Sequence, residues 1–447
     1  MSVAVIGGGY AGMAAAVTLA DAGVRTTVYE AGSELGGRAR RVVVNDAVLD
    51  NGLHILVGAY TETLRLIRAV HPEPAKALYR LPLDWRIHRR FHLKTWPLPA
   101  PLHVGMGLLT SSGARWSERI KGARFMAAMR SSGFRLQRDT TVSALLAGHH
   151  QGPTLTHYLW EPLCVAALNT PPQIASAQTF LNVLRDAMDG SRAAGDILLA
   201  RVDLSALFPD PAAAYLRARG GKVIAGTLVT GLDERPNGST VITRAGEDHY
   251  EHVVCAVSPH RAAALLSRLA GMSDIVATLE RLRYQPIYTV FLQFSQAVEL
   301  PAPMLGLDAT AHWIFDRGAI SGQPGLVAAV ISSAGEHQRL TLEELAMLVH
   351  GELERELGPL PPLAWHRVIA EKRATFECAV GVKRPATRTP LANVHLAGDY
   401  TASDYPGTIE AAVRSGIAAA HQVLEIGAVR ERAESVASDR VDHVRTL

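Results

Sequence analysis

The 447-residue sequence contains little cysteine and no long hydrophobic run. Its three cysteines, Cys164, Cys255 and Cys378, are too few and too far apart for a disulfide framework or a metal motif, so we expect a reducing compartment and no bound metal. No run of eighteen apolar residues is present, so we expect no transmembrane helix. The first predicted strand starts at residue 3, so we also expect no signal peptide.

Charged residues are sparse as well, at 19%, whereas hydrophobic residues make up 48%. A chain of this length and composition can bury the cores of two domains. Its beginning follows a strand–helix–strand pattern. The apolar run at 3–6 predicts a buried strand, the alanine-rich run at 10–22 predicts a helix, and 25–29 predicts a second strand.

Three glycines between the first strand and the helix have the spacing of a dinucleotide-binding turn. Gly7 allows the tight turn, Gly9 lets the backbone approach a diphosphate, and Gly12 lets helix and strand pack closely. The helix N-terminus offers free N–H groups to the phosphates. Glu30, at the end of the second strand, is placed to accept hydrogen bonds from an adenosine ribose. This pattern alone does not separate FAD from NAD.

The residues after Glu30 are more specific, because they continue into the turn Gly36-Gly37-Arg38. This extension resembles the N-terminal fingerprint of the flavin amine oxidase and phytoene desaturase superfamily of FAD enzymes. The resemblance implies FAD as cofactor, with Gly37 and Arg38 along the flavin diphosphate. It also implies that Val229, near the predicted return to the nucleotide-binding part, holds the adenine through its backbone.

Asp50-Asn-Gly-Leu-His54 resembles a segment that lies near the isoalloxazine ring in the superfamily. Gly52 and His54 are therefore candidates for flavin contact, although an ordinary turn beside a hydrogen-bonded histidine explains them equally well.

The superfamily's second FAD motif has a counterpart near the end of the chain, in the strand and turn Asn393-Val-His-Leu-Ala-Gly398-Asp399 followed by a predicted helix over 408–424. By resemblance, Gly398 and Asp399 contact the ribityl chain or phosphate. The resemblance also implies that Thr408 and Ile409 at the helix N-terminus face the pyrimidine end of the flavin, where the helix dipole favours a negative charge.

Taken together, the motifs imply an α/β fold with a Rossmann-type FAD-binding domain, discontinuous in sequence, and an inserted α+β substrate domain. The predicted FAD-binding domain comprises 1–85, 210–270 and 366–427, the predicted substrate domain 86–209 and 271–365, and a charged, loose tail 428–447. The surroundings of Cys378 lack the glycine-rich setting of a flavin-linking cysteine, so we expect non-covalent FAD.

The interior segment 157–186 resembles a narrower family, the hydroxysqualene dehydroxylases, although apolar helices of a plain core would look similar. The resemblance implies a long isoprenoid substrate, reduction of an allylic alcohol, and an electron donor for the flavin. A poor leaving group needs a general acid, for which the candidates are His54, Glu161, Asp186 and Asp404. The alternatives are a carotenoid desaturase or amine oxidase, or a flavin-binding subunit without turnover.

Basic residues concentrate in 80–138, where twelve Lys or Arg face two acids and aromatic residues interleave with the cations, while the rest of the chain has a net charge of −7. No nucleic-acid motif accompanies them, so we expect no nucleic-acid partner. A solvated basic face is one reading. The other is contact with anionic lipid, which the resemblance favours and which places the protein in the cytoplasm, on the inner face of the membrane.

A helix is predicted over 116–138 within this basic region. Its spacing places Trp116, Ile120, Ala123 and Ala127 on one face.

Overall fold

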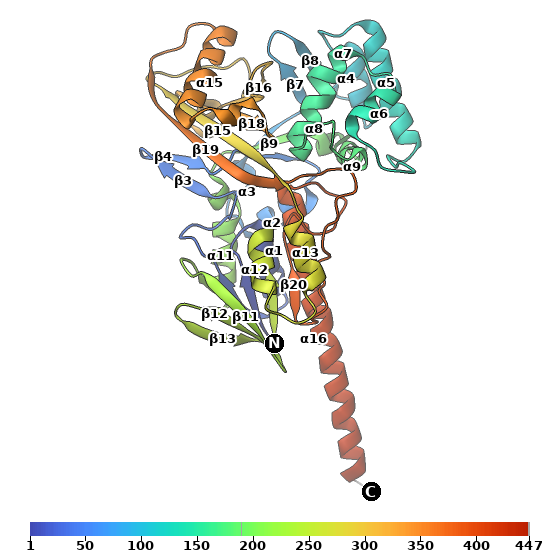
Figure 1. Ribbon diagram of the computed structural model, residues 1–447, viewed down its shortest axis with the longest axis vertical. Helices are drawn as coiled ribbons and strands as arrows, with labels where there is room; N and C mark the ends of the chain where they lie inside the picture. The colour runs from blue at the N-terminus through green and yellow to red at the C-terminus, as the bar shows by residue number, and fades with distance from the viewer. Residues whose placement is uncertain (189, 446–447) are drawn as a thin grey trace.

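The computed structural model describes residues 1–188 and 190–445, with side chains up to residue 427. A nucleotide-binding part and a second part built around a large, mostly antiparallel sheet lie end to end, and the C-terminal helix projects beyond the nucleotide-binding part (Figure 1). The chain passes repeatedly between these two parts.

The nucleotide-binding part is built on a five-stranded parallel sheet in the order β10-β2-β1-β14-β20. Its strands are β1 (Ser2–Ile6), β2 (Arg25–Tyr29), β10 (Lys222–Ile224), β14 (His252–Cys255) and β20 (Val394–Leu396). These strands come from distant parts of the sequence, as the discontinuous Rossmann-type domain requires, and the predicted fold class is confirmed.

Two long helices, α1 (Tyr10–Asp21) and α16 (Ile409–Arg445), pack against each other beside this sheet. Nearly all of α1 is buried, which explains why its sequence is alanine-rich rather than amphipathic. The two backbones come so close that a Cβ on Gly416 would lie 2.0 Å from the carbonyl oxygen of Ala11. Gly416 therefore permits this helix contact.

The second part contains a seven-stranded sheet in the order β19-β15-β18-β17-β16-β7-β8. Its strands are β7 (Asp84–Ile87), β8 (Phe91–Lys94), β15 (Tyr284–Phe294), β16 (Met304–Gly306), β17 (Trp313–Asp316), β18 (Leu326–Ser332) and β19 (Leu363–Phe376). One face of this sheet packs on α15 (Leu342–Leu357) through the core of Val290, Leu292, Leu345 and Val349. The helix begins at a capping box, in which the side chain of Thr341 accepts a hydrogen bond from the amide of Glu344.

A group of helices lies beside the large sheet (Figure 1). It comprises α4 (Leu102–Thr110), α5 (Trp116–Ser131), α6 (Val142–Gly148), α7 (Pro153–Leu155), a π-helical turn (Thr156–Trp160), α8 (Glu161–Leu168) and α9 (Ala177–Met188). This group buries Phe125, Trp160 and Phe180 in the largest apolar core.

Smaller elements complete the structure. The strands are β3 (Arg41–Val44) with β4 (Ala47–Asp50), β5 (Ile55–Val57) with β9 (Ile197–Ala200) and β6 (Leu78–Leu81), and β11 (Val229–Arg235) with β12 (Gly238–Thr243) and β13 (Gly246–Tyr250). The helices are α2 (Thr61–Val70), α3 (Pro74–Ala77), α10 (Leu204–Leu207), α11 (Pro209–Ala218), α12 (Pro259–Leu266), α13 (Ser273–Glu280) and α14 (Arg317–Ser321), with 3-10 turns at Arg192–Gly195 and Glu336–Arg339.

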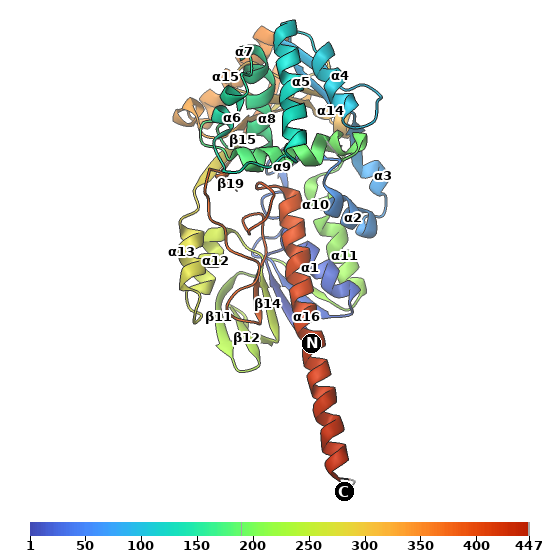
Figure 2. The same cartoon turned by 90° about the vertical axis from the view of Figure 1, so that its right-hand side faces the viewer.

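The structure differs from the sequence-based expectations in three places. The predicted FAD-binding domain includes 366–427. Strand β19 nevertheless belongs to the large sheet, because it pairs with β15 along most of its length. Helix α5 ends at Ser131 and is followed by a turn through Gly133, whereas the sequence predicts a helix to residue 138. Helix α16 continues to Arg445, so the tail predicted to be loose from residue 428 is helical to that point (Figure 2).

Among the residues that the structure describes, no helix combines the length and the apolar character that crossing a bilayer requires.

Candidate functional site

A cavity of about 680 Å³ lies between the nucleotide-binding sheet and the large antiparallel sheet, and both contribute to its walls. Eleven of the twelve residues predicted to bind the cofactor line it, namely Gly7, Gly9, Glu30, Gly37, Arg38, Gly52, Val229, Gly398, Asp399, Thr408 and Ile409. Segments more than 350 residues apart in sequence thus meet around one space.

Gly12, the twelfth, lies behind the turn rather than at the cavity surface. A Cβ on Gly12 would lie 1.9 Å from the carbonyl oxygen of Gly7, so its role is the close packing of α1 on the turn. Gly7 itself has a φ of +110°, a conformation that side chains disfavour. Both glycines shape the turn, and Gly9 forms the surface that the cavity presents.

The N-terminus of α1 points its first amides at this space. Gly9 is the N-cap, no side chain of the described residues caps the helix, and Tyr10 and Ala11 of the first turn line the cavity. Free N–H groups and the positive end of the helix dipole at this point suit a diphosphate.

Glu30 lies at one end of the cavity, where its two carboxylate oxygens accept hydrogen bonds from the amides of Gly8 (2.7 Å) and Gly32 (2.8 Å). These bonds fix the orientation of the carboxylate just after β2, in the cavity wall to which Val229 also contributes. The arrangement fits the predicted contact with a ribose.

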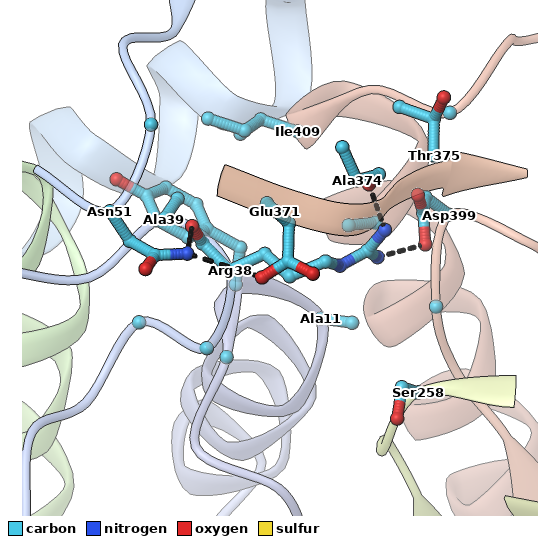
Figure 3. Close-up of a pocket in the computed structure, with 18 of the residues that line it drawn as sticks. Ala11, Arg38, Ala39, Asn51, Ser258, Glu371, Ala374, Thr375, Asp399 and Ile409 are labelled. Atoms are coloured by element: carbon cyan, nitrogen blue, oxygen red, sulfur yellow. Dashed lines mark hydrogen bonds and ion pairs between the residues drawn. The ribbon is translucent and has the colours of Figure 1, made fainter. Parts of the chain in front are cut away.

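The Gly-Gly-Arg turn and the Ala-Gly-Asp turn are joined directly. The Arg38 guanidinium donates hydrogen bonds to Oδ1 of Asp399 and to the carbonyl oxygen of Ala374, each at 2.5 Å (Figure 3). The aliphatic part of Arg38 runs along the cavity wall. The two motifs that the sequence places at opposite ends of the chain therefore form one charged pair.

Helix α16 begins at the same wall. Thr408 caps it, since its hydroxyl accepts a hydrogen bond from the amide of Ala411 at 3.2 Å, and Ile409 is the first helical residue. Gly407, just before the cap, leaves room beside Asp399, because a Cβ there would lie 3.2 Å from the carboxylate.

Two observations test whether FAD fits this cavity. A Cβ built on Gly9 would meet nothing closer than 3.8 Å, so this glycine faces open space in the cavity. The hydroxyl of Tyr400, which also lines the cavity, is buried and has no hydrogen-bond partner among the described residues. An open glycine cradle and an unpartnered donor beside paired Arg38 and Asp399 fit a large polar cofactor.

Of the four residues predicted as general acids, only His54 lines the cavity. Its Nδ1 lies 2.8 Å from the carbonyl oxygen of Gly52, to which it donates. Burial, aided by the positive charge of Arg38, lowers the pKa of His54, so the ring is neutral at neutral pH and a weak proton donor.

The structure does not bring the other three acids to the cavity. Asp186 pairs with Arg185, with 2.7 Å between Oδ1 and Nε, and Asp404 is exposed. Glu161 is the first residue of α8 and is partly buried outside the cavity.

Sequence reasoning missed several cavity residues. Glu371 and Asn51 face each other in the cavity wall (Figure 3). Asn169, just after α8, forms side-chain hydrogen bonds with β15, with β19 and with the residue that follows β18. Asn51 belongs to the segment Asp50–His54 that resembles the superfamily, so the sequence could have identified it. Glu371 lies in an ordinary β-pattern and carries no signal in the sequence.

Comparison with known proteins places this geometry in context. A family model described as flavin containing amine oxidoreductase matches residues 10–424. The hydroxysqualene dehydroxylase of Rhodopseudomonas palustris is 30% identical over 442 residues, covering 95% of this chain and 99% of the relative. A probable zeta-carotene desaturase of Synechococcus elongatus is 24% identical, covering 96% and 100% of the two chains.

Among solved structures, a putative protoporphyrinogen oxidase from Exiguobacterium sp. 255-15 has a TM-score of 0.68 at 16% identity, covering 94% of this chain and 98% of the other. At this level of identity the likeness concerns the fold.

Proposed function

Since the chain belongs to the flavin containing amine oxidoreductase family and, within it, to the family of the hydroxysqualene dehydroxylases, we propose that it reduces hydroxysqualene, a C30 allylic alcohol, to squalene with loss of water. It is an FAD-dependent oxidoreductase of squalene metabolism. The proposal rests on 30% identity along almost the full length of a dehydroxylase, with the cofactor motifs gathered around one cavity.

FAD, when bound, supplies hydride chemistry to the site. Gly9 and the first amides of α1 would hold its diphosphate, Glu30 its ribose, and Asp399 its ribityl chain. The N-terminus of α16 would face the flavin and favour its anionic reduced form.

The remaining cavity wall suits a hydrocarbon. Apolar side chains of β15, β17 and β18 and of helix α8 make up this wall: Ala166, Ala167, Ile287, Trp313, Phe315 and Val330. Such a lining excludes water and leaves orientation to a few polar groups. It fits a long isoprenoid chain.

The direction of electron flow tests the proposal. A dehydroxylase consumes reduced flavin, whereas a desaturase or amine oxidase produces it. Anaerobic protein with photoreduced FAD should convert hydroxysqualene to squalene while the visible absorbance of oxidised flavin returns. Bleaching of oxidised flavin by a polyene or an amine would replace the proposal with the desaturase or amine oxidase reading. Absence of turnover with every substrate would favour the non-catalytic subunit.

We also propose that the protein attaches peripherally to the anionic inner face of the cytoplasmic membrane through α4 and α5. Three large apolar side chains are exposed in this region, namely Trp116 (61%), Leu102 (59%) and Trp96 (45%). The predicted apolar face of α5 is thus not its core face, which is formed by Gly122, Phe125 and Met129. Exposed aromatic residues among arginines suit a lipid headgroup region.

Sedimentation with vesicles tests this attachment. Arg124 is exposed, and Arg124→Glu changes two charge units, which is worth roughly 2 kcal/mol or about 30-fold in affinity for anionic vesicles. Trp116→Ser should also weaken binding. Leu342→Ser, at a half-exposed position on α15, is the control and should bind as the wild type does. Equal sedimentation with neutral and anionic vesicles would leave only a solvated basic face.

A further inference from the structure

The large antiparallel sheet presents one of its faces to the cavity. Ile287 on β15 is directly opposite both Glu371 on β19 and Ser332 on β18, and all three line the cavity. Directly opposed residues of antiparallel strands point to the same face. The neighbouring pair along these strands, Tyr288 and Ile331, faces α15 instead.

Glu371 is the sole ionisable side chain that this sheet contributes to the cavity, among the residues that the structure describes. The other residues of the sheet in the cavity wall are Ile287, Trp313, Phe315, Val330, Ser332, Ala374 and Thr375. The carboxyl group of Glu371 thus lies among side chains of the sheet that are apolar or carry a hydroxyl group.

The backbone around Glu371 is irregular in a way that aims this side chain. The pairing of β19 with β15 shifts register between Gln285 and Ile287, so that extra residues after Glu371 bulge out of the ladder. Bulges of this kind turn side chains and are frequent beside active sites. The bulge also frees the carbonyl oxygen of Ala374, which accepts the hydrogen bond from Arg38.

The carboxyl group of Glu371 has weak partners. Oε2 lies 3.4 Å from Nδ2 of Asn51 (Figure 3). Oε1 lies 3.2 Å from the amide nitrogen of Arg373. Arg38 is close, but its guanidinium donates to Asp399 and Ala374. The Glu371 carboxyl group is therefore held in position at the wall, and among the described residues it has no ion pair of its own.

The other titratable groups in the cavity are poor candidates for donating a proton to a substrate. His54 is neutral, and burial raises the pKa of the phenols of Tyr10, Tyr29, Tyr60 and Tyr400 above their ordinary value. Asp399 is paired with Arg38, and Glu30 is held by two amides at the ribose end.

From this arrangement we propose that Glu371 is the general acid that protonates the departing hydroxyl group, with Asn51 as the residue that positions it. The inference rests on the proposed function. The proton of Glu371 moves to the hydroxyl oxygen. The C–O bond then breaks, its electron pair stays with the oxygen, and water departs from an allylic carbocation. Bound reduced flavin would supply the hydride that this carbon requires, which balances the reduction of the alcohol against the oxidation of the flavin, and Glu371 would recover its proton from solvent.

The first test compares Glu371→Gln with Glu377→Gln. The Glu377 carboxylate accepts a hydrogen bond from Gln285 at 2.9 Å and is outside the cavity wall, so it provides a matched control. Both variants should stay yellow and bind hydroxysqualene as the wild type does, measured by its perturbation of the oxidised flavin spectrum. Reoxidation of reduced flavin by hydroxysqualene should be slower in Glu371→Gln by ~10²–10⁴-fold, the usual contribution of a general acid. Glu371→Asp should retain part of the rate.

The second test removes the need for an acid. The acetate ester of the same alcohol carries a leaving group that departs without protonation, so Glu371→Gln should reduce it within about tenfold of the wild-type rate. A merely structural role for Glu371 would slow alcohol and ester equally, and that result would overturn the proposal.

A third readout is independent of hydride transfer. With the flavin kept oxidised in ¹⁸O-labelled water, reversible loss of the hydroxyl group should label hydroxysqualene in the wild type and not in Glu371→Gln. Equal labelling in both, or full turnover by Glu371→Gln, would also dismiss Glu371 as the acid. If the wild type itself fails to reduce hydroxysqualene, the proposed function falls instead.

Discussion

The guanidinium of Arg38 and the carboxylate of Asp399 form an ion pair at 2.5 Å although 361 residues separate them. Arg38 belongs to the turn after β2, and Asp399 to the turn after β20, at the outer edge of the same parallel sheet. The pair therefore connects the first and last cofactor motifs of the chain across the cavity. Its integrity should matter both for the fold and for the cofactor.

Asp399→Ala should lose FAD, because the carboxylate that would hold the ribityl chain is removed and Arg38 is left without the partner that fixes its position. We expect a colourless protein and an apparent loss of stability of about 1–3 kcal/mol in urea unfolding. Arg388→Ala is the control, since Arg388 pairs with Glu425 at a site where both side chains are more than 60% exposed, and such pairs contribute at most about 1 kcal/mol. Asp399→Ala protein with full flavin content would contradict the assignment.

Gly9 and Gly12 should respond differently to the same substitution. Gly9→Val projects into open cavity space, so the protein should fold with an unchanged far-ultraviolet circular dichroism spectrum and release or fail to bind FAD. Gly12→Val collides with the backbone of Gly7 and should prevent the turn from forming, which abolishes soluble protein. Gly9→Val protein that remains yellow would show that the diphosphate lies elsewhere.

The close contact of α1 and α16 predicts a strong effect at Gly416. Gly416→Ala places a methyl group against the carbonyl oxygen of Ala11, so the helices must separate, and we expect a loss of about 1–3 kcal/mol. Gly351→Ala, in α15, meets no atom within 4 Å and should instead gain up to about 1 kcal/mol from the better helix propensity of alanine. Thermal unfolding of the two variants under the same conditions measures both effects.

Acid sensitivity should arise partly at His395, a buried residue of β20 whose Nδ1 lies 3.1 Å from Oε1 of Gln422 on α16. Burial lowers its pKa from 6.5 to about 4, so the unfolded chain binds a proton at this residue before the folded protein does. Its effect on the free energy of unfolding is absent above pH 6.5 and grows as the pH falls to 4, reaching about 3 kcal/mol of destabilisation.

His395→Asn keeps a donor toward Gln422 and removes the titration. The difference in unfolding free energy between variant and wild type should therefore shift in favour of the variant between pH 6.5 and pH 4. A difference that stays constant over this window would show that His395 is not protonated on unfolding.

The parts of the site that sequence predicts are those fixed by backbone geometry. Gly7, Gly12 and the helix that follows them carry their own conformational requirements, so the turn is readable without a partner. Glu371 could not be found in this way, because its position in the cavity depends on pairing with β15, more than seventy residues earlier, and on a local bulge.

The face of α5 that packs on the core could not be predicted from spacing. Spacing places Trp116 and Ala127 on one face, and both are exposed, while Gly122 and Phe125 pack inward. Spacing identifies that a helix forms, but which face meets the core depends on the elements packed beside it. The basic composition of the region hid that choice.

The strand order of the parallel sheet has a consequence for the synthesis of the protein. At ~5–20 residues per second, a ribosome finishes β20 roughly 20–80 s after β1. Both strands belong to the same sheet, in which β1 is central and β20 is an edge strand. Throughout that interval the apolar surface of α1 is without its partner α16, so the nascent chain has to be shielded from aggregation. The chain can consequently bind the flavin only near the end of its synthesis. A chain whose synthesis stalls before residue 394 cannot hold the cofactor, because it lacks β20 and Asp399.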